Sequence, residues 1–238
     1  MRTDCDGLLP DYVVIGHVTR DLVPGVGYVS GGTACYSAVY ADMLGRRVGV
    51  VTSASALPDA LLGHPGIAVA CQFGELTTTY ENVYVDGART QYIRAVAPSI
   101  LGTDVPQEWL NTAIVHLGPL NHEINLDIVD LFPNSLVGVT PQGWLRAWEA
   151  DGRIIPCEWS QAEPVLDRAD AIILSQEDVG GDWDWLRNIS RKTRLLVVTD
   201  GRHGAVVFNA GKITNVPAYE VAEVDPTGAG DVFAAAFL

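Results

Sequence analysis

Short runs of apolar, mostly β-branched residues recur along the chain, separated by glycine turns or by stretches with helical spacing. Most of these runs are apolar at every position, which predicts strands buried on both faces in a mostly parallel sheet. Stretches such as 33–44 and 124–132 have apolar residues at helical spacing and are expected to cover that sheet. The sequence therefore predicts an α/β sandwich with helices on both sides. The runs are 12–16, 48–52, 67–71, 113–117, 136–140, 171–174 and 195–199.

One stretch departs from this pattern. Residues 77–85 and 88–95 alternate in polarity, and Asp86 and Gly87 between them form a strong hairpin signal. With 26–30 they predict a small antiparallel sheet that projects as a lid, over segments about 25–31 and 76–96. Spacing alone leaves open an ordinary edge hairpin of the main sheet. Nothing resembles a linker, so residues 1–238 are expected to form one domain.

Charge and composition exclude several kinds of partner. The chain has 15 Lys plus Arg against 29 Asp plus Glu, a net charge of -14, so neither nucleic acid nor an anionic membrane is expected to bind. Only Lys192 and Lys212 are lysines, so anions would be held by backbone N–H groups of glycine turns or by single arginines. Four scattered cysteines, no signal peptide and no long apolar run predict reduced thiols and a cytoplasmic location.

The most informative glycine turn precedes an alanine-rich run with good helix propensity. Gly228, Ala229 and Gly230 are expected at the first turn of that helix, where N–H groups lack intrahelical acceptors and can bind an anion. Asp231 follows in the same turn. The helix dipole would keep its carboxylate ionised and ready to accept a proton from a hydroxyl that attacks a phosphate. The alternative is that Asp231 is only a helix-favouring acid after a turn.

The residues around this turn resemble a known family. Asp-Pro-Thr-Gly-Ala-Gly-Asp at 225–231 is similar to the C-terminal signature of the PfkB carbohydrate kinases, which have the ribokinase-like fold. Residues 14–21 resemble the first strand of that family and the acid after it. Residues 30–36 resemble its Gly-Gly substrate turn, and residues 198–204 resemble its nucleotide-side T-x-G-x-x-G. The resemblance extends over essentially the whole chain.

The resemblance implies a role for each matching position. Asp231 would be the catalytic base, with ATP as donor and Mg²⁺ bridging its phosphates. The anion hole would consist of Gly228, Ala229 and Gly230. Asp225 and Thr227 match positions that help hold a monovalent cation such as K⁺. The remaining positions are Asp21, Gly31 and Gly32 for substrate hydroxyls, and Thr199, Gly201 and Gly204 for the nucleotide.

Three departures from the family pattern stand out. Tyr36 occupies a substrate-site position where many members have asparagine, which leaves the identity of the sugar open. Ser175 and Asp178 stand where the family has N-x-x-E, on the nucleotide side, with Glu177 as the local alternative. The chain stops at Leu238, inside the helix that follows the signature, so a truncated C-terminus is expected.

Two further sets of residues are candidates for ligand contacts. Tyr92 and Arg94 lie two apart on a lid strand, so they would face the same side and could contact substrate, as in 2-keto-3-deoxygluconate kinases; a surface Tyr–Arg stack is the alternative. His17 lies near the substrate segment, either as a ligand contact or as a satisfied loop histidine. His116 and His122-Glu123 have no third ligand at metal spacing, so zinc is not expected.

These observations together predict an ATP-dependent kinase for a hydroxyl of a small sugar, polyol or related carbohydrate. A non-catalytic ligand-binding relative remains an alternative, as does a kinase for a nucleoside or a 2-keto-3-deoxy sugar acid. An NAD-dependent oxidoreductase is disfavoured because no G-x-G-x-x-G opens the chain. The edges of a lid sheet also leave open a homodimer.

Overall fold

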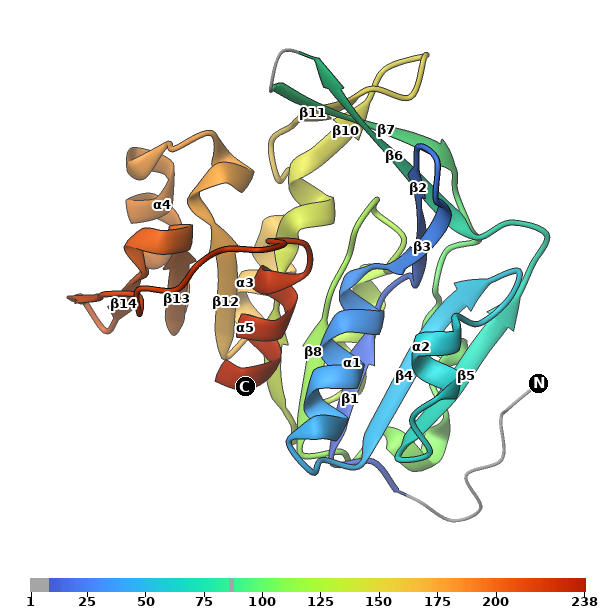
Figure 1. Cartoon of the computed structure of the whole chain (residues 1–238). Helices are drawn as coiled ribbons and strands as arrows, with labels where there is room; N and C mark the ends of the chain where they lie inside the picture. Colours follow the sequence, from blue (N-terminus) through green and yellow to red (C-terminus); the bar gives the residue numbers. More distant parts are fainter. Residues whose placement is uncertain (1–8, 86–87) are drawn as a thin grey trace.

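The computed structural model describes residues 9–238 except 86–87. Within this part of the chain, nine strands form the main sheet, in the order β15-β14-β13-β12-β9-β8-β1-β4-β5 (Figure 1). The strands from β13 to β5 are parallel, and β14 and β15 add antiparallel strands at one edge. Their bounds are β1 Tyr12–Ile15, β4 Val48–Ala54, β5 Ile67–Phe73, β8 Ile114–Leu117, β9 Leu136–Val139, β12 Ala171–Ser175, β13 Leu195–Thr199, β14 Ala205–Asn209 and β15 Lys212–Val216.

Strand β1 shows why these runs form a central sheet. Its residues are buried on both faces. Tyr12 and Val14 belong to one core cluster, and Val13 and Ile15, which point to the opposite face, belong to another. Burial of every position removes apolar surface from water on both sides of the sheet, which is the pattern expected from the sequence.

Helices cover both faces of the main sheet. On the face of Tyr12, α1 and α5 lie side by side in front of the strands, with α2 beside them (Figure 1). The other face is covered by α3, α4 and the 3-10 helix η3. The helix predicted over 124–132 is this shorter 3-10 helix, which Asn125 caps by accepting from the Asp127 N–H. The bounds are α1 Thr33–Met43, α2 Asp59–Leu62, η3 Leu126–Leu131, α3 Ala162–Arg168, α4 Trp183–Ser190 and α5 Ala229–Phe237.

A separate four-stranded sheet in the order β3-β2-β6-β7 stands beside the carboxyl ends of the parallel strands (Figure 1). The alternative of an edge hairpin on the main sheet is therefore wrong. Pairs β2–β3 and β6–β7 are antiparallel, but β2–β6 is parallel, so the small sheet is mixed. The predicted Asp86-Gly87 turn lies outside the described residues. The bounds are β2 Thr19–Val23, β3 Gly27–Gly31, β6 Thr78–Val85 and β7 Ala88–Ala95.

The remaining elements are short. Strands β10 (Arg146–Trp148) and β11 (Ile154–Pro156) form a hairpin, and 3-10 turns occur at η1 Gly102–Asp104, η2 Gln107–Trp109, η4 Pro141–Leu145, η5 Gln176–Val179 and η6 Gly201–His203. Trp144 and Trp159, which the sequence places in polar stretches, are buried and stack with ring centroids 5.5 Å apart. Among the described helices, none is long and apolar enough to cross a membrane.

Candidate active site

The first turns of α1 and α5 meet at the carboxyl edge of the sheet. The hydroxyl of Thr33, the first residue of α1, donates to Asp231 Oδ1 over 2.6 Å. One turn later, Ser37 Oγ donates to the main-chain oxygen of Asp231 over 3.1 Å. The helix that follows the predicted substrate turn therefore holds the predicted base.

The glycine turn before α5 leaves some of its N–H groups without acceptors. Gly228 is the N-cap of α5 and adopts the left-handed conformation, with φ 76°. The N–H of Ala229 donates to Pro226 O over 3.1 Å. In the part of the chain that the structure describes, the N–H groups of Gly228, Gly230 and Asp231 have no hydrogen-bond acceptor. The donors available to an anion are thus these three, and the expectation that Ala229 contributes its own N–H is wrong.

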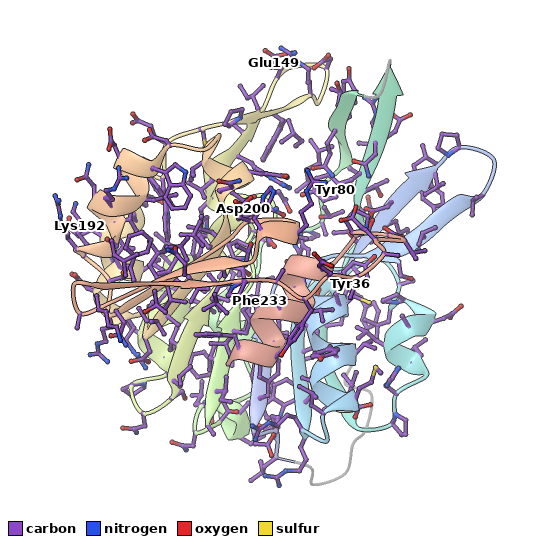
Figure 2. The ribbon with its side chains drawn as sticks, turned by 60° about the vertical axis from the view of Figure 1, so that its left-hand side comes forward. Tyr36, Tyr80, Glu149, Lys192, Asp200 and Phe233 are labelled. Atoms are coloured by element: carbon purple, nitrogen blue, oxygen red, sulfur yellow. The ribbon has the colours of Figure 1, made fainter. Side chains whose placement is uncertain are left out.

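Tyr36 of α1 packs against this turn, and Figure 2 shows it beside the start of α5. Its hydroxyl donates to Ser30 O over 3.4 Å. Burial raises the pKa of Tyr36 to about 12, with smaller contributions from the negative charges of Asp21 and Asp231. Tyr36 therefore lies between the predicted acceptor residues and the anion-binding turn.

Gly228→Ala is expected to disturb both fold and activity. A Cβ there would lie 2.7 Å from Tyr36 Cγ, and the positive φ disfavours any side chain. We expect a loss of about 1–3 kcal/mol in unfolding free energy, together with reduced turnover. Gly211→Ala is the matched control, because it has φ 79° but no atom within 4 Å. Thermal melts and turnover check both variants; equal losses in the two would contradict the packing role of Tyr36.

The predicted acceptor residues come together at the base of the small sheet. A Cβ on Gly31 would lie 2.9 Å from Asp21 Oδ2, so the carboxylate rests against the turn. Gly32 has φ 92°, and a Cβ there would lie 2.5 Å from His17 O, so no larger residue fits. The His17 ring is buried and contacts Pro98 O, Asn121 Oδ1 and Thr78 Oγ1, which makes it a satisfied loop histidine.

Strand pairing separates Tyr92 and Arg94 from this group. Asp21 pairs with Tyr80, and Tyr80 pairs with Ile93, so these three side chains share one face. Tyr92 and Arg94, the neighbours of Ile93, face the other side. Arg94 stacks on Tyr92 with its guanidinium carbon 4.3 Å from the ring centroid. It also pairs with Glu81 over 2.7 Å, so the surface stack is the correct alternative and the structure does not bring this pair to Asp231.

The face that Asp21 shares with Tyr80 carries polar residues that sequence reasoning missed. Asn82 and Gln91 pair there, and Gln91 Nε2 donates to Asn82 Oδ1 over 3.1 Å. Arg146, from β10 of the main body, donates to Gln91 Oε1 over 3.3 Å, and its charge lowers the pKa of Asp231. The alternation of β6 and β7 could have indicated Asn82 and Gln91, but only if Tyr80 had been identified as inward-facing.

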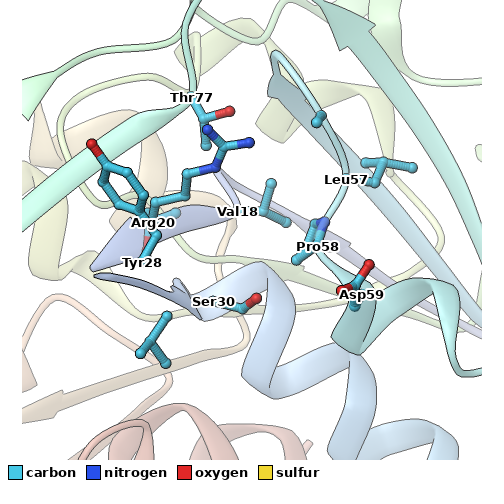
Figure 3. A pocket seen from close by; sticks show the side chains of 11 residues that line it. Val18, Arg20, Tyr28, Ser30, Leu57, Pro58, Asp59 and Thr77 are labelled. Carbon is cyan, nitrogen blue, oxygen red and sulfur yellow. The ribbon is translucent and has the colours of Figure 1, made fainter. Parts of the chain in front are cut away.

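A cavity of about 220 Å³ lies beside β2 and β3, on the side where Arg20 projects (Figure 3). It is lined by Arg20, Tyr28, Asp59 and Thr77, among others. Arg20 is adjacent to Asp21 on β2 and therefore faces the opposite side. Asp231 and the 228–230 turn do not line this cavity, so it is not the site described above.

On the predicted nucleotide side, Asp178 is the carboxylate whose negative charge acts on Asp231. Its Oδ1 accepts from Gln142 Nε2 over 2.9 Å, and its Oδ2 accepts from the Ser175 N–H over 2.9 Å. Glu177, the local alternative, has an exposed side chain. Burial raises the pKa of Asp231 to about 6; the Thr33 hydrogen bond opposes this, and the charge of Asp178 adds to it. Burial thus outweighs the expected stabilisation by the helix dipole, but a pKa of about 6 still leaves the carboxylate mostly ionised at neutral pH, as expected.

The other nucleotide-side residues lie at the ends of neighbouring strands. Thr199 ends β13, and its hydroxyl donates to Leu174 O over 3.4 Å. Gly201 and Gly204 bound the 3-10 turn after it with φ 47° and 100°. Thr227 donates its N–H to Asp225 Oδ1 over 2.9 Å. Hydrogen bonding by the Thr227 side chain, and then by this N–H, lowers the pKa of the exposed Asp225. Within the described ranges, no group of three or more His, Cys, Asp or Glu side chains has metal-binding geometry.

Comparisons with known proteins bear on the family and the fold. Residues 183–238 match the model of the pfkB family carbohydrate kinases. A cytidine kinase of Thermococcus kodakarensis is 27% identical over 251 residues, which span 96% of this chain and 87% of the relative. A fructokinase of Klebsiella pneumoniae is 40% identical over 85 residues, 31% of this chain and 28% of the relative. A solved pyrophosphate-dependent kinase of the ribokinase family superposes with a TM-score of 0.81 at 22% identity, covering 95% of this chain and 85% of that structure.

Proposed function

The chain is a kinase of the pfkB carbohydrate kinase family with the ribokinase-like fold, and on this premise we propose that it transfers the γ-phosphoryl group of ATP to a hydroxyl of a small sugar or polyol. One observation carries the proposal. Thr33 of α1 holds Asp231 by a hydrogen bond, and Asp231 lies in the first turn of α5, where N–H groups have no acceptors. Phosphoryl transfer to an alcohol needs a general base next to N–H groups that bind the negative oxygens of the phosphoryl group.

In the proposed reaction, Asp21 and the Gly31-Gly32 turn bind hydroxyls of the acceptor. Asp231 takes the proton of the attacking hydroxyl while its oxygen bonds to the γ-phosphorus. The bond to the bridging oxygen breaks, and its electron pair leaves with ADP. The N–H groups of Gly228, Gly230 and Asp231 hold the negative oxygens of the transferring group, and the positive charge of Arg146 offsets the remaining charge.

The negative charge of Asp178 raises the pKa of Asp231. A cation between carboxylates and donor phosphates relieves such repulsion, so these residues fit a magnesium–nucleotide complex, which Asp178 would contact through water. When bound, Mg²⁺ neutralises charge on the donor phosphates. Thr199, Gly201 and Gly204 are proposed to contact the nucleotide, and Asp225 and Thr227 a K⁺ ion.

The acceptor is proposed to be a neutral polyhydroxylated compound. Asp21, Asn82 and Gln91 share one sheet face and offer carboxylate and amide groups, which bind hydroxyls in both directions. Among the described side chains of β6 and β7 on the same face, the aromatic one is Tyr80, which is buried and donates its hydroxyl to Leu120 O over 3.1 Å. It is thus not placed to stack on a nucleobase, which favours a sugar or polyol over a nucleoside.

A coupled ADP-release screen over sugars, polyols, nucleosides and 2-keto-3-deoxy sugar acids tests this function. We expect turnover with at least one neutral sugar or polyol. Pyrophosphate serves as a second donor arm, with release of inorganic phosphate measured in place of ADP, because the kinase whose structure superposes with a TM-score of 0.81 is pyrophosphate-dependent. Turnover only with nucleosides would contradict the acceptor class. Ligand binding without phosphoryl transfer from either donor would support a non-catalytic relative.

Pairing of two copies through the lid stays a prediction. Strand β3 is an edge of the small sheet; Val26, just before it, is 72% exposed, and Tyr28, near its start, is 63% exposed. Edge strands with apolar side chains tend to pair with other chains. We expect light scattering to give twice the monomer mass, and Val26→Asp with Tyr28→Lys to shift the protein toward monomer. A monomeric wild-type protein at micromolar concentration would contradict this prediction.

A further inference from the structure

The two oxygens of the Asp231 carboxylate have different surroundings. Oδ1 accepts the Thr33 hydroxyl hydrogen over 2.6 Å, a short bond typical of a charged acceptor. No other hydrogen bond to the carboxylate oxygens of Asp231 occurs among the described residues. Oδ2 is therefore the oxygen left for an incoming proton.

We propose that Thr33 is a positioning residue that directs the acceptor proton to Oδ2 of Asp231. This inference rests on the proposed kinase function, since only a proton-accepting Asp231 needs such direction. Protonation of Oδ1 would turn the acceptor of the Thr33 bond into a weaker hydroxyl acceptor, whereas protonation of Oδ2 leaves Oδ1 as the carbonyl acceptor of that bond.

The packing of Thr33 fixes its hydroxyl in this orientation. Its side chain is 3% exposed, and a Cβ added to Gly118 would lie 2.3 Å from Thr33 Cγ2, so the methyl group rests directly on that glycine. Ser37, one helical turn later, holds the Asp231 main chain over 3.1 Å. Two hydroxyls at i and i+4 on α1 thus fix both the backbone and the side chain of Asp231.

Thr33 also connects the two halves of the site. It follows directly after Gly31 and Gly32, the turn proposed to hold the acceptor. Any shift of that turn on acceptor binding moves the first residue of α1, and with it the hydrogen bond to Asp231. The base is therefore aligned by the same segment that contacts the alcohol it deprotonates.

Several charged or titratable groups face Asp231 and enter its pH dependence. Asp178 of η5 and Arg146 of β10 act directly on its charge. Tyr12 of β1, with Cys35 and Tyr36 of α1, also interacts with it electrostatically. Each of these is the same in a Thr33 variant, so a change in the pH profile reports the lost hydroxyl.

The test compares Thr33→Val, which keeps the shape but loses the hydroxyl, with Thr33→Ser, which keeps the hydroxyl. Since a hydrogen bond to a charged group is removed, we expect Thr33→Val to lower kcat about 10- to 100-fold with little change in acceptor KM. We expect the acidic limb of kcat/KM to move to higher pH, because the hydroxyl stabilises the ionised carboxylate. Thr33→Ser should stay within about threefold of wild type and keep the wild-type limb.

Thr112→Val is the matched control, a buried Thr whose hydroxyl donates to Pro10 O over 3.2 Å near the amino ends of the strands. We expect Thr112→Val to change neither kcat nor the acidic limb of kcat/KM. If Thr33→Val melts at a lower temperature than wild type, the rates of both proteins are compared at a temperature at which both remain folded. If the wild type turns over and Thr33→Val has the same kcat and the same acidic limb of kcat/KM, the positioning role of Thr33 is wrong. The kinase function would still stand. Absence of turnover in the wild type overturns the kinase function and this inference with it.

Discussion

Asp231→Asn is expected to lower kcat by at least about 1,000-fold, because the amide keeps the size of the carboxylate but cannot accept the proton. Acceptor KM should change little, since Asp21 and the Gly31-Gly32 turn are untouched. Steady-state rates of ADP release measure both. Asp167→Asn, at an exposed position of α3, is the control and should leave the rate unchanged. Retention of more than a tenth of the wild-type kcat in Asp231→Asn would contradict the assigned base.

The same substitution should stabilise the protein. Burial raises the folded-state pKa of Asp231 to about 6 from a usual value of 3.8, so the folded protein takes up the proton first. The free energy of unfolding therefore falls as pH rises from about 3.8 to about 6, where Asp231 ionises in the folded protein. Above about pH 6 the full destabilisation is present. Replacing the carboxylate by an amide should add about 1–3 kcal/mol at pH 7, and the gain should shrink toward pH 4. Denaturant unfolding at both pH values separates this effect from misfolding.

Arg146→Gln is expected to lower kcat by about 100-fold, since it removes the positive charge beside the transferring group. It should also move the acidic limb of kcat/KM to higher pH, because Arg146 lowers the pKa of Asp231. The rate and the limb are measured over pH 5 to 8, a window around the base's pKa of about 6.

Arg153→Gln is the matched control, because Arg153 is an exposed arginine of the loop between β10 and β11 that pairs with Glu149. It should leave kcat and the limb unchanged. Equal effects of the two substitutions would show that Arg146 acts through the hairpin and not through its charge at the site.

Much of the main sheet could be predicted because its strands are buried on both faces. Val13 and Ile15 face one side of the sheet, and Tyr12 and Val14 face the other. A strand that is apolar on both faces must be covered on both sides to be kept from water. The turn at Gly228 was also predictable, since its glycines precede a strong helix former. Strand β2 was missed because Thr19–Val23 mixes polar and apolar residues on a half-buried sheet.

The errors at the site arise from information that only three-dimensional pairing supplies. The sequence suggested Tyr92 and Arg94 and not Gln91, because spacing reveals which residues share a face but not which face points inward. Arg146 follows a 3-10 turn with no periodicity, so nothing local connects it to a base 85 positions later. Thr33 was visible in the glycine segment, but its contact with Asp231 depends on how α1 and α5 pack.

The pKa of Asp231 could not be read from the sequence either. A first-turn acid is ordinarily stabilised by the helix dipole, which would lower its pKa. Here burial between two helices outweighs that effect, and the neighbouring charge of Asp178 adds to it. The proposed base thus has a pKa of about 6, close to the neutral pH at which it would act.

The most direct measurement of the central claim is ³¹P NMR of the wild-type protein with Mg²⁺-ATP and the best acceptor from the screen. The proposed chemistry predicts a new phosphomonoester signal that grows one for one with ADP, and that is lost with Asp231→Asn. Accumulation of inorganic phosphate in its place, or an equal phosphomonoester signal from Asp231→Asn, would contradict phosphoryl transfer to an alcohol by this base.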